Sequence, residues 1–179
     1  MPLLVGLDLD GYRCGLDPAG QAIIDCSRFI NDRPTLEFRG LMAYAGASYH
    51  LNKATEKGHL IQNQLSAALS LKRELDFDCP VISLGSTPAF MNAENLTGAT
   101  EIRGGIYVFQ DLFQAGQGHC AILDIALSVL TRVISVQEHR NRFFIDAGAL
   151  ALSKDTSTKG YDYDAAYGLV CNAIGGQPI

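Results

Sequence analysis

A glycine and two hydroxyl residues follow an apolar stretch in the segment VISLGSTPAF, residues 81–90. A glycine at the end of a strand lets the backbone approach a ligand closely, and the amides and hydroxyls of Ser86 and Thr87 can donate hydrogen bonds to phosphate oxygens. We therefore interpret Gly85, Ser86 and Thr87 as a candidate anion-binding loop. A turn that ends at Pro88, in which Ser86 and Thr87 only satisfy the local backbone, explains the same residues.

Charged residues end another apolar stretch near the start of the chain. The segment DLDGYRCG, residues 8–15, places Asp8, Asp10 and Arg13 at the end of an expected strand. Two nearby carboxylates are typical of a metal site or an acid–base pair, but the alternation of a regular strand sends Asp8 and Asp10 to opposite faces. Arg13 then pairs with one of these acids or with a ring or carboxylate of a ligand. Taken by itself, the segment favours a structural ion pair over a ligand contact.

Tyrosine and histidine side chains follow a third apolar stretch. The segment GLMAYAGASYH, residues 40–50, contains Tyr44, Tyr49 and His50. A tyrosine and a histidine at the end of a strand can act as general acid and base, so we predict Tyr44 and His50 as candidate catalytic residues. Both residue types are also ordinary at the rim of a sheet. No group of histidines and cysteines has the spacing of a metal site.

The elements that position these residues alternate between strand and helix. Apolar stretches at 3–10, 36–44 and 80–84 predict strands, and apolar residues at helical spacing predict helices over 21–33 and 55–77. Strands and helices that alternate at this spacing form right-handed crossover units, which build a parallel sheet with helices outside it. An open doubly wound sheet and a segment of a barrel both fit this pattern.

The pattern changes in the second part of the chain. The stretch from residue 121 to residue 153 is rich in β-branched residues and has turn residues at 138–141, which predicts long strands in an antiparallel pair. We therefore expect an α/β domain over 1–112 and part of a β-rich domain over 113–179.

Composition limits the classes of partner. The 179 residues carry a formal net charge of −5 without a run of lysines and arginines, so neither a nucleic acid nor an anionic membrane surface is expected as a partner. No apolar run reaches the length of a membrane helix, and the five cysteines lie singly, which favours a cytoplasmic protein with reduced thiols. A small polar ligand is the expected partner.

Several common catalytic motifs are absent from the sequence. The chain contains no GxSxG, HExxH, GxGxxG or Walker-type loop. None of its five lysines lies inside an apolar strand, where desolvation would lower the pKa of the amine and prepare it for Schiff-base chemistry.

Five segments taken together carry a family resemblance. They are VGLDLDGYRCG, GLMAYAGASYH, VISLGSTPAF, TEIRGGIYVFQD and FFIDAGALALSKD, in this order. The chain from Leu3 to about Gly168 resembles the pyridoxal-phosphate enzymes of the alanine-racemase-like fold, specifically the D-threonine aldolase and D-serine dehydratase branch. The resemblance implies a TIM-type (β/α) barrel that carries the cofactor, followed by a β-domain that closes the active site, usually across a dimer.

The resemblance also implies roles for individual residues. The loop of Gly85, Ser86 and Thr87 would hold the cofactor phosphate. Further contacts to the phosphate would come from Gly104, Gly105 and Tyr107. The residues beside the pyridoxal ring would be Arg13, Tyr44 and, less directly, His50. The substrate would be a D-amino acid such as D-threonine or D-serine.

Two features of the family have no match in this sequence. The family's Schiff-base lysine lies on an early barrel strand, and its divalent metal is held by a histidine and a cysteine or aspartate near the end of the β-domain. We therefore expect the second half of the barrel and the start of the β-domain, with no metal ligands and no activity on its own. The alternatives are an amino acid racemase of the same fold, a non-catalytic cofactor-binding protein and a structural fragment.

Overall fold

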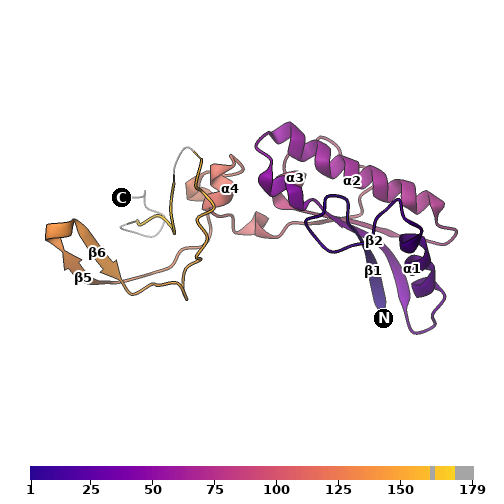
Figure 1. Cartoon of the computed structure of the whole chain (residues 1–179), viewed down its shortest axis with the longest axis horizontal. Helices are drawn as coiled ribbons and strands as arrows, with labels where there is room; N and C mark the ends of the chain where they lie inside the picture. The colour runs from indigo at the N-terminus through magenta and orange to yellow at the C-terminus, as the bar shows by residue number, and fades with distance from the viewer. Residues whose placement is uncertain (162–163, 172–179) are drawn as a thin grey trace. The chain divides into compact units, whose positions relative to one another are not determined.

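The computed structural model describes residues 1–161 and 164–171, and the chain divides into two compact units, Met1–Tyr107 and Val108–Ile179 (Figure 1). The first unit contains every residue predicted for the site. Part of the expected β-rich domain, 162–163 and 172–179, lies outside the described residues.

A parallel sheet forms the centre of the first unit. Its strands are β1 (Pro2–Leu7), β2 (Glu37–Tyr44), β3 (Val81–Gly85) and β4 (Glu101–Arg103), and they lie in the order β1-β2-β3-β4. Each strand pairs in parallel with the next. Because the spatial order follows the sequence without a reversal, this is the arrangement of a (β/α) barrel and not of a doubly wound sheet. The predicted α/β class with a partial barrel is confirmed.

Two long helices, α1 (Gln21–Asn31) and α2 (Ala54–Glu74), cover one face of this sheet (Figure 1). Both are amphipathic, because Ile23 and Ile30 of α1 and Ile61 and Leu65 of α2 are buried at helical spacing. Helix α1 ends shortly before Pro34, whose ring disfavours a helical conformation in the residue before it. The helical stripes read from the sequence therefore pack on the sheet as expected.

Strand alternation separates a hydrophobic face from a polar one. Leu41, Ala43, Ile82 and Leu84 are at most 1% exposed and belong to the same core cluster as the buried residues of α1 and α2. The residues between them along β2 and β3 point to the other face, which is the inner face of a barrel. That inner face carries Met42, Tyr44, Ser83 and Gly85.

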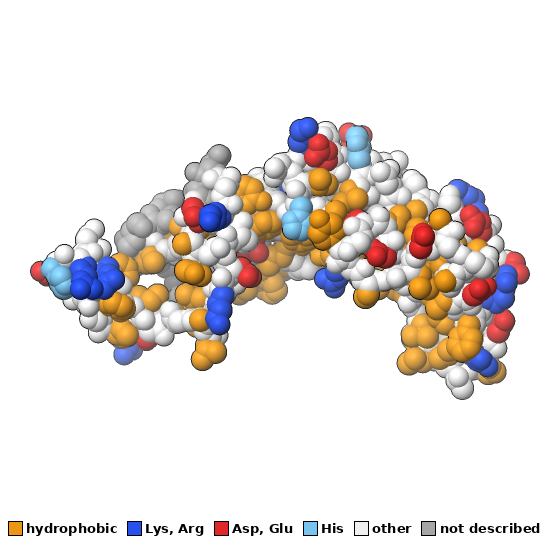
Figure 2. All heavy atoms as spheres, viewed as in Figure 1, with side chains coloured by type: hydrophobic (Ala, Val, Ile, Leu, Met, Phe, Trp, Pro, Cys, Tyr) orange, Lys and Arg blue, Asp and Glu red, His pale blue; other side chains and the backbone are white. Residues whose placement is uncertain are grey.

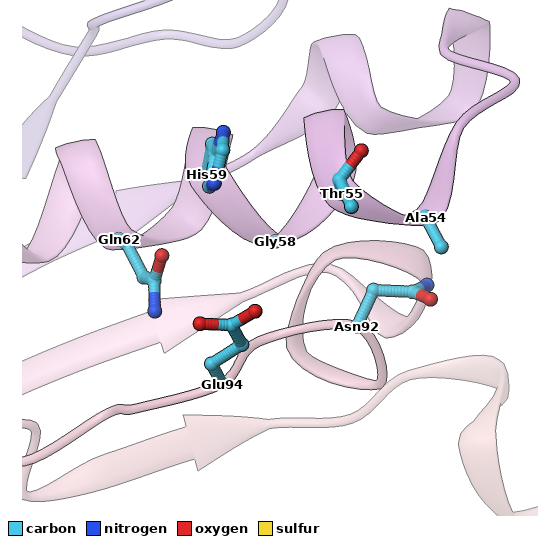
Figure 3. Close-up of a pocket in the computed structure, with 7 residues that line it drawn as sticks. All are labelled: Ala54, Thr55, Gly58, His59, Gln62, Asn92 and Glu94. Atoms are coloured by element: carbon cyan, nitrogen blue, oxygen red, sulfur yellow. The ribbon is translucent and has the colours of Figure 1, made fainter.

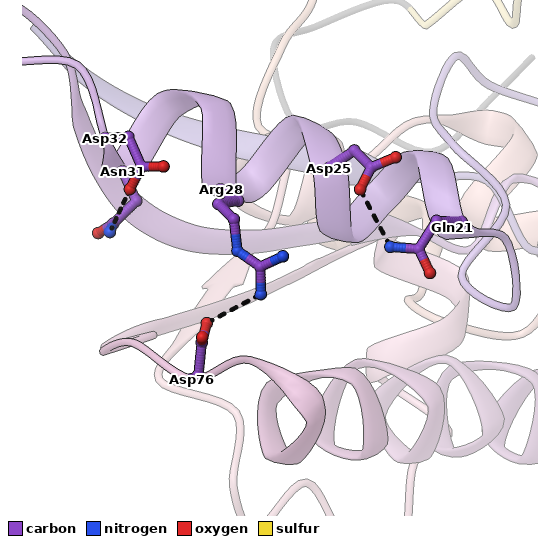
Figure 4. A network of polar contacts seen from close by, with 6 residues as sticks. All are labelled: Gln21, Asp25, Arg28, Asn31, Asp32 and Asp76. Carbon is purple, nitrogen blue, oxygen red and sulfur yellow. Dashed lines mark hydrogen bonds and ion pairs between the residues drawn. The ribbon is translucent and has the colours of Figure 1, made fainter.

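The outer layer is joined by weak polar contacts. Arg28 Nη2 of α1 lies 3.1 Å from Asp76 Oδ1, just after the end of α2 (Figure 4). Two further contacts, between Gln21 and Asp25 and between Asn31 and Asp32, are local to α1 and the residue after it. Because Arg28 and Asp76 are both largely exposed, solvent screens their attraction, and apolar packing on the sheet holds α1 in place.

Short elements follow the strand ends. They are η1 (Gly46–His50) after β2, α3 (Thr87–Phe90) after β3 and η2 (Ile106–Val108) after β4. The carboxyl ends of parallel strands meet at one edge of a sheet, so these elements gather the segments that the sequence singled out.

The second unit contains little regular structure. Its elements are α4 (Leu112–Gly116), η3 (Ile122–Asp124), β5 (Val133–Gln137), η4 (Glu138–Arg140) and β6 (Arg142–Ile145). Strands β5 and β6 form the expected antiparallel pair, with a turn that ends at Asn141 in the left-handed region. The prediction of long strands is wrong, because no strand is present over 121–132 and the pair is short. A β-branched composition forms a strand only where a neighbouring strand accepts its hydrogen bonds.

None of the helices within the described residues is both long and apolar enough to cross a membrane.

Candidate functional site

Three strand ends bring together the core of the candidate site. Tyr44, the last residue of β2, is paired with Gly85 at the end of β3, and Gly85 is paired with Arg103 at the end of β4. Residues paired across parallel strands point to the same face, so Tyr44 and Arg103 lie on either side of Gly85 on the inner face. The sequence identified Tyr44 and Gly85 but missed Arg103.

Gly85 is required by the packing around it. A Cβ atom at this position would lie 2.8 Å from Arg103 Nη2 and 2.9 Å from Tyr44 Cδ2. Both separations are closer than van der Waals contact allows, so any larger residue would displace one of the two side chains. The glycine thus lets a guanidinium and an aromatic ring close over the backbone of β3.

Arg103 is held by the sheet itself. Its guanidinium donates hydrogen bonds to Ser83 Oγ and to Ala43 O, the latter at 2.8 Å, and Ser83 Oγ lies 2.5 Å from Glu101 Oε1. Burial lowers the pKa of Arg103 below its ordinary value. A guanidinium nevertheless stays protonated in proteins, and its hydrogen bonds to Ser83 Oγ and Ala43 O hold this positive charge beside Gly85. The sequence indicated this role only through the spacing of Arg103 and Glu101, which lie two residues apart and therefore on the same face of a short strand.

Ser86 has a backbone conformation that side chains rarely adopt, with φ at 109°. It is 1% exposed, and its hydroxyl oxygen lies 2.6 Å from that of Ser48, which in turn lies 2.7 Å from Ala45 O. Ser48 is itself fully buried in η1. A pair of buried hydroxyls therefore joins the segment after β2 to the segment after β3.

Thr87 is the third residue of the predicted anion loop. It is 1% exposed, and its Oγ1 atom has no hydrogen-bond partner among the residues that the structure describes. A buried hydroxyl without a hydrogen-bond partner raises the free energy of the folded state, and an anion that accepts a hydrogen bond from it would remove this penalty. Thr87 therefore retains an unused hydrogen-bonding group at the end of β3.

Arg13 and Tyr44 lie together. The Cζ atom of Arg13 is 4.8 Å from the centroid of the Tyr44 ring, which is the geometry of a cation–π contact. The hydroxyl of Tyr44 lies 3.5 Å from that of Tyr49. The structure thus brings Arg13 from the segment after β1 to the end of β2.

Asp10 organises the segment after β1 and makes no ion pair with Arg13 in the described part of the chain. Its carboxylate accepts hydrogen bonds from the backbone amides of Tyr12 at 3.2 Å and Ala47 at 3.0 Å. Gln64 Nε2 of α2 lies 3.4 Å from Asp10 Oδ2 and 3.1 Å from Tyr44 O. The role of Asp10 is thus to hold the strand-end segments, which sequence spacing did not indicate.

His50 lies at the edge of this region. Its ring contacts Tyr12, with the centroids 4.9 Å apart, and the residue is exposed. Tyr44 instead contacts Arg13 and Tyr49. The two residues predicted to act as acid and base therefore have different neighbours.

The segment after β4 offers exposed backbone. A Cβ atom on Gly105 would meet nothing within 4 Å, whereas one on Gly104 would lie 3.1 Å from Tyr107 Cβ. The Tyr107 ring packs against Phe90, with centroids 5.3 Å apart, and remains half exposed. Gly104 thus supports the packing of Tyr107, and Gly105 leaves its backbone open.

Lys57 is a buried amine that lies outside the strands. It is 1% exposed in the first turns of α2, and burial lowers the pKa of its amine below the ordinary 10.5. Its spacing from Ile61 and Gln64 places it on the buried face of the helix. The strand pattern of the sequence did not indicate Lys57, because this residue belongs to a helix.

A pocket lies between α2 and the segment after α3 (Figure 3). Figure 3 shows Gln62 and Glu94 on its two sides. Its lining residues are Ala54, Thr55, Gly58, His59, Gln62, Asn92 and Glu94. None of the residues predicted for the site is among them. Across 1–161 and 164–171, no three His, Cys, Asp or Glu side chains are grouped as metal ligands.

Comparison with known proteins supports the resemblance read from the sequence. The family model for the alanine racemase N-terminal domain matches residues 1–112, and the model named "Putative serine dehydratase domain" matches residues 126–175. D-threo-3-hydroxyaspartate dehydratase from Delftia sp. (strain HT23) is 35% identical over 175 residues, and D-serine dehydratase from Dictyostelium discoideum is 31% identical over 159 residues.

The coverage of these relatives is partial. The two alignments include 96% and 83% of this chain but 46% and 40% of the relatives. The solved structure of the Delftia enzyme superposes with a TM-score of 0.88 at 34% identity, over 98% of this chain and 47% of that one. The chain thus spans about half the length of the curated relatives it matches. By its sequence and its fold, the chain belongs to the family of the alanine racemase N-terminal domain.

Proposed function

We propose that this chain is the phosphate- and ring-binding part of a pyridoxal-phosphate-dependent dehydratase that acts on a D-amino acid with a hydroxyl group on Cβ. Both curated relatives are named as dehydratases, one for D-threo-3-hydroxyaspartate and one for D-serine. These two compounds share the D configuration and the Cβ hydroxyl. The aldolase implied for the same branch and an amino acid racemase of the same fold are the alternatives.

The observation that carries the proposal is the arrangement at the strand ends. Thr87 presents a buried hydroxyl without a partner in the described structure, and Arg103 provides a fixed positive charge beside Gly85. An unused donor and a nearby cation fit an anionic group such as a phosphate monoester. Gly105 adds open backbone, and Tyr107 lies next to it.

The ring of the cofactor would lie beside Arg13 and Tyr44. The bound pyridoxal would supply an electron sink for the charge that develops on Cα when a proton is lost. Tyr44, whose hydroxyl lies 3.5 Å from that of Tyr49, would hold or move a proton, and Arg13 would keep the Tyr44 ring in position through its cation–π contact. His50 is a second candidate for proton transfer at the rim of the site.

The Schiff-base lysine is proposed to lie outside the present sequence. Lys57 is the buried lysine of the barrel unit, and it belongs to α2 and not to a strand end. The remaining lysines are Lys53, Lys72, Lys154 and Lys159. Residues 1–112 would then form the second half of the barrel, and residues 113–179 the start of the β-domain. We also propose a homodimer, which sedimentation of the native protein would test.

The first experiment is a titration with pyridoxal phosphate and, separately, with pyridoxal. Absorption spectra are recorded before and after borohydride reduction, and any adduct is located by peptide mapping. We expect pyridoxal phosphate to bind more tightly than pyridoxal, with a measurable dissociation constant for both compounds, and no adduct on any of the five lysines. Equal affinity for the two compounds would overturn the phosphate site, and an adduct on one lysine would overturn the proposed source of the Schiff-base lysine.

A second experiment separates the reaction classes. The native protein is assayed with D-serine, D-threonine and D-alanine. A dehydratase removes the Cα proton and the Cβ hydroxyl, so D-serine and D-threonine should yield ammonia and a 2-oxo acid. D-alanine lacks the hydroxyl and should be left unchanged. Formation of glycine and acetaldehyde from D-threonine would identify an aldolase, and conversion of D-alanine to L-alanine a racemase.

A further inference from the structure

We propose that Ser48 is a positioning residue that accepts the one hydrogen bond that the Ser86 hydroxyl can donate. Thr87, and not Ser86, then donates the side-chain hydrogen bond to the cofactor phosphate. This inference rests on the proposed function and makes it more specific. It assigns different roles to three hydroxyl residues that the sequence does not distinguish.

The direction of the hydrogen bonds follows from the number of protons available. Ser48 Oγ lies 2.7 Å from Ala45 O, and a carbonyl oxygen can only accept, so the Ser48 hydroxyl must donate to it. A hydroxyl carries a single proton. In the 2.6 Å contact between Ser48 Oγ and Ser86 Oγ, the proton therefore comes from Ser86.

The proton of Ser86 is thus committed inside the protein. Ser86 is 1% exposed and Ser48 is fully buried, so water does not compete for this hydrogen bond. A bound anion would have to displace Ser48 as the acceptor before the Ser86 side chain could donate to it. The backbone amide of Ser86 is not affected by this constraint.

The same hydrogen bond stabilises an unfavourable backbone. Ser86 has φ at 109°, a conformation that a residue with a side chain keeps only when its surroundings hold it there. Ser48 belongs to η1, which follows β2, whereas Ser86 follows β3. The contact therefore fixes the β3 loop from the neighbouring strand end.

Thr87 is left as the hydroxyl that can donate. Its Oγ1 atom is buried and lacks a partner in the described structure, although it immediately follows the residue that Ser48 fixes. A phosphate oxygen at this point would satisfy the group. The Ser48 hydroxyl thus fixes Ser86, and the fixed backbone of Ser86 in turn sets the position of the Thr87 hydroxyl.

The test measures dissociation constants for pyridoxal phosphate and pyridoxal in the full chain. The variants are Ser48→Ala, Ser86→Ala, their combination and Thr87→Val, which replaces a hydroxyl by a methyl of similar size. Ser27→Ala is the matched control, because Ser27 is a fully buried serine of α1 whose hydroxyl has no partner in the described structure. Circular dichroism checks that each variant is folded, and Ser48→Cys replaces Ser48→Ala if that variant does not fold.

We expect Thr87→Val to weaken pyridoxal phosphate binding about tenfold or more and to leave pyridoxal binding unchanged. Ser48→Ala and Ser86→Ala should each weaken pyridoxal phosphate binding about five- to tenfold, and the double variant should be no weaker than either, because both remove the same hydrogen bond. Ser27→Ala should bind like the wild type. A purely structural role of Ser48 would weaken binding of both compounds alike.

The contrary results are distinct. If Ser86→Ala weakens binding equally in the wild type and in Ser48→Ala, Ser86 donates directly to the phosphate and the inference is wrong. If Thr87→Val binds like the wild type, Thr87 is not the donor. If the wild type prefers pyridoxal phosphate to pyridoxal but one of these two variant results is found, only this inference is overturned. If the wild type binds the two compounds equally, the proposed function is overturned as well.

Discussion

Close packing at the strand ends gives individual residues specific tasks. Gly85 leaves room for Arg103 and Tyr44, and Ser86 adopts its conformation against Ser48. These tasks depend on distances of about 3 Å, so single atoms added or removed there should have measurable effects.

Replacing Gly85 by alanine should damage the site. The new Cβ would lie 2.8 Å from Arg103 Nη2 and 2.9 Å from Tyr44 Cδ2, and overpacking of this kind costs about 1–3 kcal/mol in the free energy of unfolding. We expect lower stability in urea and weaker binding of pyridoxal phosphate. Gly148→Ala is the matched control, because its Cβ would meet nothing within 4 Å. Unchanged binding in Gly85→Ala would show that the phosphate loop lies elsewhere.

Replacing Lys57 by methionine should change the pH dependence of stability. Burial lowers the pKa of Lys57 in the folded state, so between that lowered value and 10.5 the unfolded chain holds a proton that the folded chain has released. The free energy of unfolding therefore rises with pH in that window. Lys57→Met should lose this rise.

The measurement for Lys57 is urea unfolding at a series of pH values that approaches 10.5. Lys72→Met removes a lysine from the other end of the same helix and serves as the control. It should keep the wild-type rise. A rise of the same size in Lys57→Met would show that another group causes it.

In the first unit, the position of a helix on the sheet depends on close backbone contacts as well as on its apolar side chains. Helix α2 contacts β2, β3, η1 and α3, and its residue Gly58 faces the segment that follows α3. The polar residues Lys57 and Gln64 share its buried face with Ile61. The helix therefore covers the sheet and also holds the segments that form the site.

Gly58→Ala should destabilise the protein although alanine favours helices. A Cβ atom at residue 58 would lie 2.2 Å from Asn92 O, so the backbone of one segment would have to move. Overpacking costs about 1–3 kcal/mol, and a clash with backbone lies toward the upper end of this range, so the cost exceeds the gain of about 1 kcal/mol for glycine to alanine in a helix. Urea unfolding measures the difference. Ser66→Ala on the exposed side of α2 should change stability by about 0.5 kcal/mol or less, and an equally small effect of Gly58→Ala would contradict the close approach.

The whole molecule differs strongly between its two units. The first has a continuous core around the parallel sheet, whereas β5 and β6 of the second form a two-stranded ribbon with apolar side chains at the surface (Figure 2). These residues are Val133, Ile134, Val136, Phe143 and Phe144, each 40–64% exposed. An isolated two-stranded ribbon is marginally stable, and a contiguous apolar surface tends to associate.

Lysine at two of these positions should therefore reduce association of the chain. We expect Ile134→Lys combined with Val136→Lys to shift sedimentation profiles toward the monomer and to lower the binding of a hydrophobic dye. Leu150→Lys, which changes an exposed leucine outside the hairpin, is the control and should behave like the wild type. Equal association in the double variant would show that the hairpin surface is not responsible.

Much of the fold was predictable because it depends on local patterns. Alternating strand and helix periods gave the parallel unit, and turn residues at 138–141 gave the short antiparallel pair. Strand order was not predictable, since a barrel and a doubly wound sheet have the same local periods. The long strands expected after residue 121 were wrong, because strand formation depends on a neighbouring strand.

The sequence by itself determined that glycine, hydroxyl and aromatic residues follow the strands, and that they resemble a pyridoxal-phosphate family. Only the tertiary structure decided which of them meet. It placed Arg103 beside Gly85, paired Ser48 with Ser86, and left Thr87 without a partner in the described residues. The physical reason is that residue types and their spacing are local properties of the sequence. Which side chains meet depends instead on segments that are far apart in the chain and that the parallel sheet brings together.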